Sequence, residues 1–211
     1  QHQFMTLTPI HGALHQGGFI MNLPNKLTML RAILVPVFMA CMLYIENTVV
    51  CALVSAGVFA ITALTDMLDG KIARKYNLVT NFGKFMDPLA DKFMVFAALL
   101  VICVKSTGVL QQVMIWSSAI VFLRELGVTS IRLVCANSEA GVVAASWFGK
   151  CKTVTQIAAI FVLILEPLVV EKLFNTYYIA SYVLVAAMVV MTVGSGIDYL
   201  KTYWPYMSDK K

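Results

Sequence analysis

Long apolar runs, separated by short charged segments, set the pattern of this chain. A helix needs about 20 mostly apolar residues to cross a bilayer, whereas a barrel strand needs alternating polar and apolar positions. Alternation is absent, and three runs lack any Asp, Glu, Lys, Arg or His: residues 47–65, 106–123 and 173–197. We therefore predict six transmembrane helices, at about 26–45, 48–75, 83–105, 110–135, 153–172 and 176–201.

The composition supports a membrane protein. Of the 211 residues, 60% are hydrophobic and only 13% are charged, and the mean hydropathy is +0.81. A soluble domain carries about 25% charged residues, so this chain has too little polar surface to cover a core in water. The predicted fold class is an all-α integral membrane protein, with membrane lipids rather than nucleic acid as its surroundings. The net charge of +5 suits an anionic membrane surface.

Lysine and arginine decide the orientation, because positive charges concentrate on the cytoplasmic side of a membrane. If the first predicted helix starts inside, fourteen of the sixteen Lys and Arg residues lie at cytoplasmic ends, and only Lys105 and Lys172 lie outside. We therefore predict a multi-pass protein of the cytoplasmic membrane with both termini inside. The same orientation places the charged segment 66–91 at the cytoplasmic face.

The first twenty residues differ from the rest of the chain. Residues 1–20 hold all three histidines and no formal charge, and Met21 looks like a natural start, so we expect a remnant of cloning there. Residues 21–211 are then one catalytic domain without histidine, which excludes histidine acid–base catalysis. The five cysteines show no C-x-x-C spacing and are expected to be free thiols.

Segment 66–91 places four aspartates between two apolar runs. Asp66 and Asp69 are three residues apart and Asp87 and Asp91 are four apart, so each pair lies on one helix face. Two helices that leave and re-enter the membrane would point these carboxylates at one another, which requires cations between them. Oxygen ligands select a hard ion such as Mg²⁺ or Mn²⁺, and two ions would suit a displacement at phosphorus. We expect Asp87 to cap the third helix and Pro88 to open its first turn.

The same segment carries a family signature. The pattern D-x2-D-G-x2-A-R-x8-G-x3-D-x3-D spans 66–91 and resembles the signature of the CDP-alcohol phosphotransferases. The resemblance implies a homodimer of six-helix subunits with two divalent ions. It also implies that Asp66, Asp69 and Asp87 bind metal and that Asp91 binds metal and acts as general base. The residues expected to bind CDP-diacylglycerol are Asn25, Thr28, Asp69, Gly70, Ala73, Arg74, Gly83 and Lys84.

Basic residues at the cytoplasmic ends of other helices indicate a second anionic ligand. Arginine matches phosphate bidentately, and an acceptor that carries its own phosphate would suit such a pocket. Glu125 is expected to pair with an arginine, and Thr153 to cap the fifth helix. The expected acceptor-binding residues are Arg31, Arg124, Arg132, Lys150 and Lys152. Two structural interpretations stay open: the segment around Arg31 could serve as an N-terminal cap and anchor, and the lysines as membrane anchors.

Together, these segments resemble bacterial family members whose acceptor is sn-glycerol 3-phosphate. The resemblance implies transfer of a phosphatidyl group from CDP-diacylglycerol to glycerol 3-phosphate, with release of CMP, at the bacterial cell membrane. Another acceptor, such as inositol phosphate or serine, remains an alternative within the family. A prenyltransferase would need two separate Asp-rich motifs, and a cation transporter would need acids spread across the bilayer depth, whereas this chain has one cluster at one face.

Overall fold

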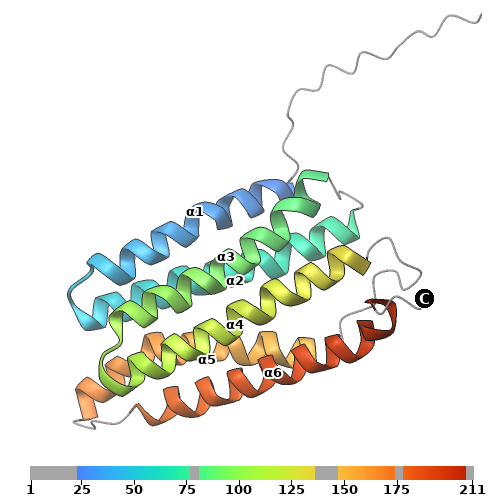
Figure 1. Cartoon of the computed structure of the whole chain (residues 1–211). Coiled ribbons are helices and arrows are strands. Elements are labelled where there is room, and N and C mark those ends of the chain that lie inside the picture. The colour runs from blue at the N-terminus through green and yellow to red at the C-terminus, as the bar shows by residue number, and fades with distance from the viewer. Residues whose placement is uncertain (1–22, 77–80, 136–146, 174–177, 208–211) are drawn as a thin grey trace, which may run out of the picture.

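The computed structural model describes residues 23–76, 81–135, 147–173 and 178–207, and this part of the chain is helical throughout apart from short connections (Figure 1). The six predicted helices are confirmed, most with ends within a few residues of those expected. Their bounds are α1 (Leu23–Tyr44), α2 (Thr48–Lys75), α3 (Asn81–Lys105), α4 (Gly108–Cys135), α5 (Trp147–Leu173) and α6 (Ile179–Met207). Residues 1–20, expected to be a cloning remnant, lie outside the described residues.

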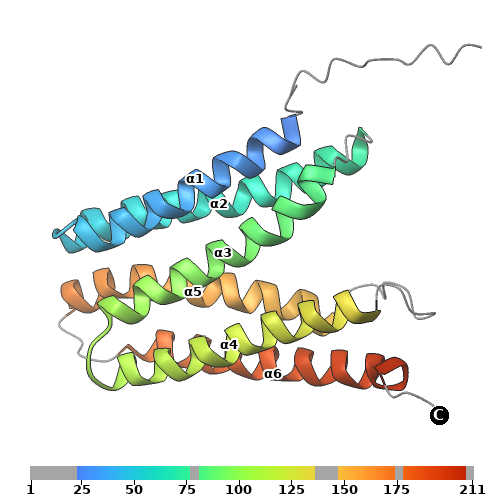
Figure 2. The same ribbon diagram turned by 45° about the horizontal axis from the view of Figure 1, so that its top comes forward.

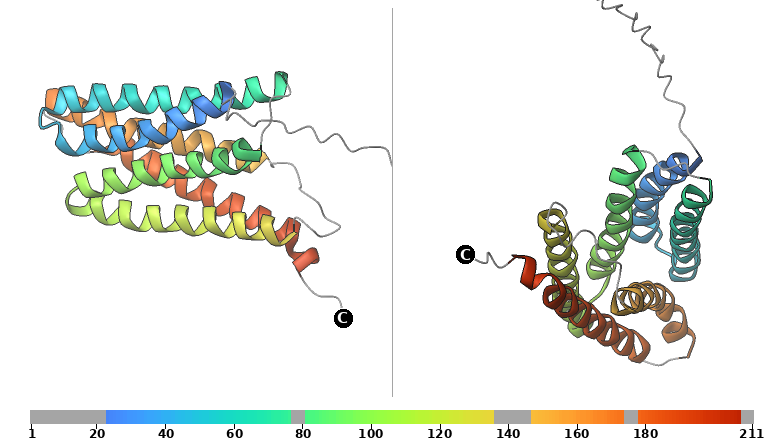
Figure 3. Two further views of the ribbon diagram at one scale, coloured as in Figure 1. Left: turned by 90° about the horizontal axis from the view of Figure 1, so that it is seen from above. Right: turned by 90° about the vertical axis from the view of Figure 1, so that its right-hand side faces the viewer.

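The helices run side by side as an elongated bundle (Figure 2). Helix α1 packs against α2 and α3, and α6 packs against α4 and α5. Helix α5 joins the two groups by also contacting α2 and α3, and α3 contacts α4 (Figure 3). We call "the site end" the end where α1, α3 and α5 begin and α2, α4 and α6 finish; the opposite end is "the far end".

Short connections at the far end have local causes in the sequence. The Asn47 side chain caps α2 by accepting a hydrogen bond from the Val50 amide at 3.0 Å. Gly108 opens α4 with a positive φ of 60°, a conformation that glycine adopts without steric cost. Helix α6 is capped from α5, because the Glu166 carboxylate accepts hydrogen bonds from the amides of Ala180 at 3.0 Å and Ser181 at 2.7 Å. The α1–α2 and α3–α4 hairpins therefore close through short connections at this end, and hydrogen bonds from Glu166 tie α5 to the start of α6.

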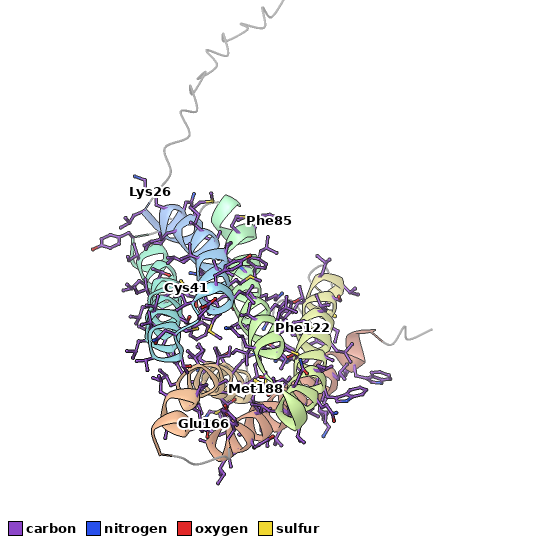
Figure 4. All side chains as sticks on the ribbon, turned by 90° about the vertical axis from the view of Figure 1, so that its left-hand side faces the viewer. Lys26, Cys41, Phe85, Phe122, Glu166 and Met188 are labelled. Atoms are coloured by element: carbon purple, nitrogen blue, oxygen red, sulfur yellow. The ribbon has the colours of Figure 1, made fainter. Side chains whose placement is uncertain are left out.

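Aromatic side chains hold the middle of the bundle together. The Phe59 ring lies 5.7 Å from Phe38 and 5.1 Å from Phe161, which joins α1, α2 and α5. Phe96 on α3 and Phe122 on α4 have centroids 4.1 Å apart. Figure 4 shows the interior from one end of the bundle, with Lys26 at its periphery. Because lipid is as apolar as these side chains, close packing rather than escape from water stabilises such contacts.

Four of the described helices are long and apolar enough to cross a membrane: residues 25–44, 48–68, 147–170 and 179–205. Helices α3 and α4, also predicted to cross, fall short of the same measure. Asp91 and Lys92 interrupt the apolar part of α3, and Arg124 and Glu125 interrupt that of α4. Charge near the site end therefore lowers the apolar character of these two helices, and their crossing stays a prediction.

Two local expectations about helix starts are wrong. Helix α3 begins at Asn81, so Asp87 and Pro88 lie inside it rather than at its cap. Helix α5 begins at Trp147 rather than at 153, and the Thr153 hydroxyl donates to the Gly149 carbonyl at 3.2 Å within the helix. The cause is the same in both places. Charged residues occupy the first turns, so the apolar run begins later than the helix does.

Candidate active site

One face of α1 carries three buried polar residues, Asn25, Thr28 and Arg31, at three-residue spacing. The Thr28 hydroxyl donates to Asp87 Oδ1 at 2.6 Å. The Arg31 Nη1 atom lies 2.7 Å from Asp66 Oδ1, with the arginine side chain 0% exposed and the aspartate 40% exposed. Helix α1 is thus fastened to α2 and α3 through two of the predicted metal ligands. Roles of these α1 residues in substrate binding stay predictions.

The acidic cluster comes from the last turns of α2 and the first turns of α3. Asp91 lies one helical turn beyond Asp87 and is exposed, and the charges of Asp66 and Arg31 both act on its carboxylate. The structure therefore brings Asp66, Asp87 and Asp91 into one region. Gly83 is buried near the start of α3. The remaining predicted residues here have side chains outside the described set: Asp69, Gly70, Ala73, Arg74 and Lys84.

The acids supply carboxylate oxygens, which are the donors that hard divalent ions prefer. Among the described side chains, no three acidic, histidine or cysteine groups lie close enough together to hold one ion. Asp66 instead meets the Arg31 guanidinium and Asp87 the Thr28 hydroxyl. The donor chemistry fits a divalent ion, and the Arg31 guanidinium supplies positive charge to this cluster.

A second cluster centres on Glu125 of α4. Its Oε1 atom lies 3.1 Å from Arg124 Nη1 and also accepts a hydrogen bond from the Lys152 ammonium of α5. Lys152 is only 7% exposed, so its charge is balanced inside the protein by this carboxylate. The predicted pairing of Glu125 with an arginine is confirmed, and Lys152 is a second partner. Lys150 is exposed on the first turn of α5.

Tyr199 of α6 gathers the two arginines of α4. The guanidinium carbons of Arg124 and Arg132 lie 5.6 Å and 5.0 Å from the centre of its ring, within cation–π range. Arg132 also donates a hydrogen bond to the Tyr199 hydroxyl. The ring of Tyr203 stacks nearly parallel to that of Tyr199, with centroids 5.9 Å apart. Both arginines therefore lie next to one residue of α6, and their role in binding the acceptor stays a prediction.

A small cavity of about 20 Å³ lies where α3, α4 and α5 meet. Its lining includes Asp91, Glu125, Lys152 and Gln156, so it touches both clusters. Beside the cavity, Lys92 of α3 donates to the Thr129 hydroxyl of α4, which in turn donates to the Glu125 carbonyl at 2.7 Å. An exposed carboxylate next to buried cations can remove a proton from a ligand whose negative charge those cations hold.

Sequence reasoning missed two residues of this region, Tyr199 and Gln156. Both lie in stretches that read as membrane-spanning, Tyr199 near the end of α6 and Gln156 within an apolar run of α5. Gln156 sits one turn after Lys152, the only signal in the sequence that could have found it. Tyr199 has no comparable local signal, because its partners come from another helix.

Comparison with known proteins finds a family model and relatives that match most of this chain. The family model for CDP-alcohol phosphatidyltransferase matches residues 21–197. A CDP-diacylglycerol–glycerol-3-phosphate 3-phosphatidyltransferase of Bacillus subtilis is 41% identical over 87% of this chain and 95% of its own length. A "Probable phosphatidylglycerophosphate synthase" of Mycobacterium tuberculosis is 38% identical over 91% of this chain and 86% of its own. A protein of Haemophilus influenzae with the same name as the Bacillus relative is 36% identical over 85% of this chain and 92% of its own length.

Proposed function

Because the chain belongs to the CDP-alcohol phosphatidyltransferase family, we propose that it transfers the phosphatidyl group of CDP-diacylglycerol to sn-glycerol 3-phosphate. The products are phosphatidylglycerophosphate and CMP, which makes the protein a phosphatidylglycerophosphate synthase of phospholipid biosynthesis. One observation supports this acceptor: an acidic residue and basic residues meet at one cavity. Asp91 lines the same cavity as Lys152 and Glu125, and Glu125 is paired with Arg124. A base and a cation-rich pocket suit a hydroxyl on a phosphorylated acceptor.

Asp91 is the proposed general base. It takes the proton from the attacking hydroxyl of the acceptor, whose oxygen forms a bond to the phosphorus that carries diacylglycerol. The bond from this phosphorus to the oxygen of CMP breaks on the opposite side. Positioning and electrostatics supply most of the catalysis in such a transfer, because the phosphoryl group needs no covalent help from the protein.

Asp66, Asp69, Asp87 and Asp91 are the proposed ligands of two Mg²⁺ or Mn²⁺ ions. The bound ions supply stabilisation of the negative charge that develops on the departing CMP. Arg31 and Thr28 hold Asp66 and Asp87 in place from α1, so they prepare the ligand set. The nucleotide is proposed to lie along Gly70, Ala73 and Arg74, with contributions from Asn25, Gly83 and Lys84.

The acceptor phosphate is proposed to bind the cations of α4 and α5. The guanidinium groups of Arg124 and Arg132 both lie close to the ring of Tyr199, and Glu125 pairs with both Arg124 and Lys152. Charge-assisted hydrogen bonds to phosphate are about twice as strong as neutral ones. Lys150, being exposed, is proposed to attract the acceptor rather than to enclose it.

The protein is a multi-pass membrane protein, and we propose that all six helices cross the bacterial cell membrane. Both termini and the active site would then lie at the cytoplasmic face, where Lys and Arg concentrate. Residues 21–211 form the proposed catalytic domain, and the functional unit is proposed to be a homodimer.

Purified protein incubated with CDP-diacylglycerol tests the proposal. Radiolabelled glycerol 3-phosphate, inositol phosphate and serine are supplied one at a time, and labelled lipid and CMP are measured. We expect product with glycerol 3-phosphate alone. Efficient transfer to either of the other acceptors would replace this function with another activity of the same family.

A further inference from the structure

The Gln156 side chain has an unpaired buried donor. Gln156 is only 1% exposed, and its Nε2 atom meets no hydrogen-bond partner among the described residues. A buried amide donor without a partner is unfavourable, and native proteins leave few of them. Such a donor that also lines a cavity indicates a ligand whose oxygen completes it.

The cavity beside Gln156 is the size of one small polar group. Its volume of about 20 Å³ is enough for one water-sized group and too small for a whole glycerol phosphate. The Lys152 ammonium, also in the lining, is already bonded to Glu125. Among the described lining residues, Gln156 Nε2 is the buried donor that meets no partner within the protein, while the carboxylates of Asp91 and Glu125 are acceptors nearby. This combination complements a hydroxyl, which accepts one hydrogen bond and donates another.

We propose that Gln156 donates a hydrogen bond to the non-reacting hydroxyl of the acceptor, the one on the carbon next to the attacking hydroxyl. The inference rests on the proposed function. The attacking oxygen must approach phosphorus in line, so it cannot be enclosed in a one-group cavity, whereas its neighbour can. Asp91 at the edge of the cavity then serves the attacking hydroxyl. Gln156 thereby fixes which of the two hydroxyls of the acceptor faces the base, and it is a specificity-determining residue for a vicinal diol.

The test compares two acceptors and two variants in the full-length protein. The acceptors are glycerol 3-phosphate and 3-hydroxypropyl phosphate, which lacks the middle hydroxyl. We expect Gln156→Met to raise the KM for glycerol 3-phosphate about 2- to 10-fold, the effect of one neutral hydrogen bond. The KM values for 3-hydroxypropyl phosphate and for CDP-diacylglycerol should not change. Gln156→Asn, which keeps an amide on a shorter side chain, should lie between wild type and Gln156→Met.

Gln111→Met is the matched control, because Gln111 is a glutamine on α4 at the far end whose Nε2 donates to the Cys103 carbonyl at 3.3 Å. It should leave both acceptor KM values unchanged. The inference is overturned if wild type uses the two acceptors equally well, or if Gln156→Met raises both acceptor KM values by the same factor. Absence of any transfer to glycerol 3-phosphate by wild type would instead overturn the proposed function, and the inference with it.

Discussion

The two ends of the bundle carry cavities of very different size and chemistry. At the far end, a cavity of about 360 Å³ is lined mostly by apolar side chains, with Glu46 and Lys105 among the few charged ones. At the site end, the cavity is only about 20 Å³, yet it meets two carboxylates and a buried lysine. Both buried charged side chains that the structure describes, Arg31 and Lys152, lie at the site end.

With the active site proposed at the site end, buried charge marks the proposed functional region better than cavity volume does. Charge inside a membrane protein is costly, so it persists where partners and a ligand compensate it. The far end has space without that chemistry. Variants at the two ends should therefore differ sharply in their effect on catalysis, and the following experiments test that difference.

The largest effect should come from removing divalent metal. Segment 66–91 contains four aspartates but no histidine or cysteine. The proposed ions therefore have no histidine or cysteine ligand there to replace the carboxylates. We expect EDTA to abolish CMP release, and Mg²⁺ or Mn²⁺ added in excess to restore it. Full activity in EDTA would contradict the two-ion proposal.

Asp91→Asn should have the next largest effect. Asparagine keeps the shape and one oxygen ligand but cannot take a proton at neutral pH. Because general-base catalysis supplies about 10²–10⁴-fold, we expect kcat to fall by at least that factor. Affinity for CDP-diacylglycerol should be retained, since three other aspartates are available for metal. Glu46→Gln is the matched control at the far end and should leave kcat unchanged; a parallel loss of lipid affinity in Asp91→Asn would make Asp91 chiefly a metal ligand.

Removing one of the two cations that pair with Glu125 should weaken acceptor binding specifically. We expect Lys152→Met and Arg124→Ala each to raise the KM for glycerol 3-phosphate roughly 10- to 150-fold, the value of one charge-assisted contact. The KM for CDP-diacylglycerol should change much less. Lys105→Met removes a lysine at the far end and should change neither KM, and exposed Lys150→Met should have a smaller effect than Lys152→Met. Unchanged acceptor KM in both Lys152→Met and Arg124→Ala would place the acceptor elsewhere.

Tyr199 should give the smallest and most graded effect, because it acts through the arginines. Tyr199→Phe loses only the hydroxyl that accepts a charge-assisted hydrogen bond from Arg132. Because this bond acts on the acceptor only through Arg132, we expect acceptor KM to rise about 2- to 5-fold, less than for loss of a direct charge-assisted contact. Tyr199→Leu also removes the ring under both guanidinium groups and should raise it further. Kinetics of both variants, with thermal stability in detergent as a control, would show whether the ring positions the arginines. Equal acceptor KM in wild type and Tyr199→Leu would exclude that role.

The helices could be predicted from the sequence because long apolar runs have few alternatives to helix in a membrane. Helix starts near the site were less predictable, since Pro88 and Thr153 look like boundary residues but lie inside α3 and α5. The acidic region followed from spacing along the chain, which fixes which side chains share a helix face. Contacts between helices could not be predicted in this way, because spacing along one helix does not indicate which residues of another helix lie next to it. The hydrogen bonds between Thr28 and Asp87 and between Arg132 and Tyr199 join residues that are 59 and 67 positions apart.

The ion pair between Arg31 and Asp66 has a consequence for how the protein is made. Helix α1 leaves the ribosome first, and Asp66 is synthesised near the end of α2. Until α2 arrives, an arginine that is fully buried in the finished bundle has no carboxylate partner, at a cost of about 2.5–3.5 kcal/mol at mid-membrane and less near the interface. We therefore expect Arg31 to stay hydrated near the membrane surface until the second helical segment brings the carboxylate of Asp66. The order in which the helices are synthesised therefore decides when this ion pair of the proposed active site can form.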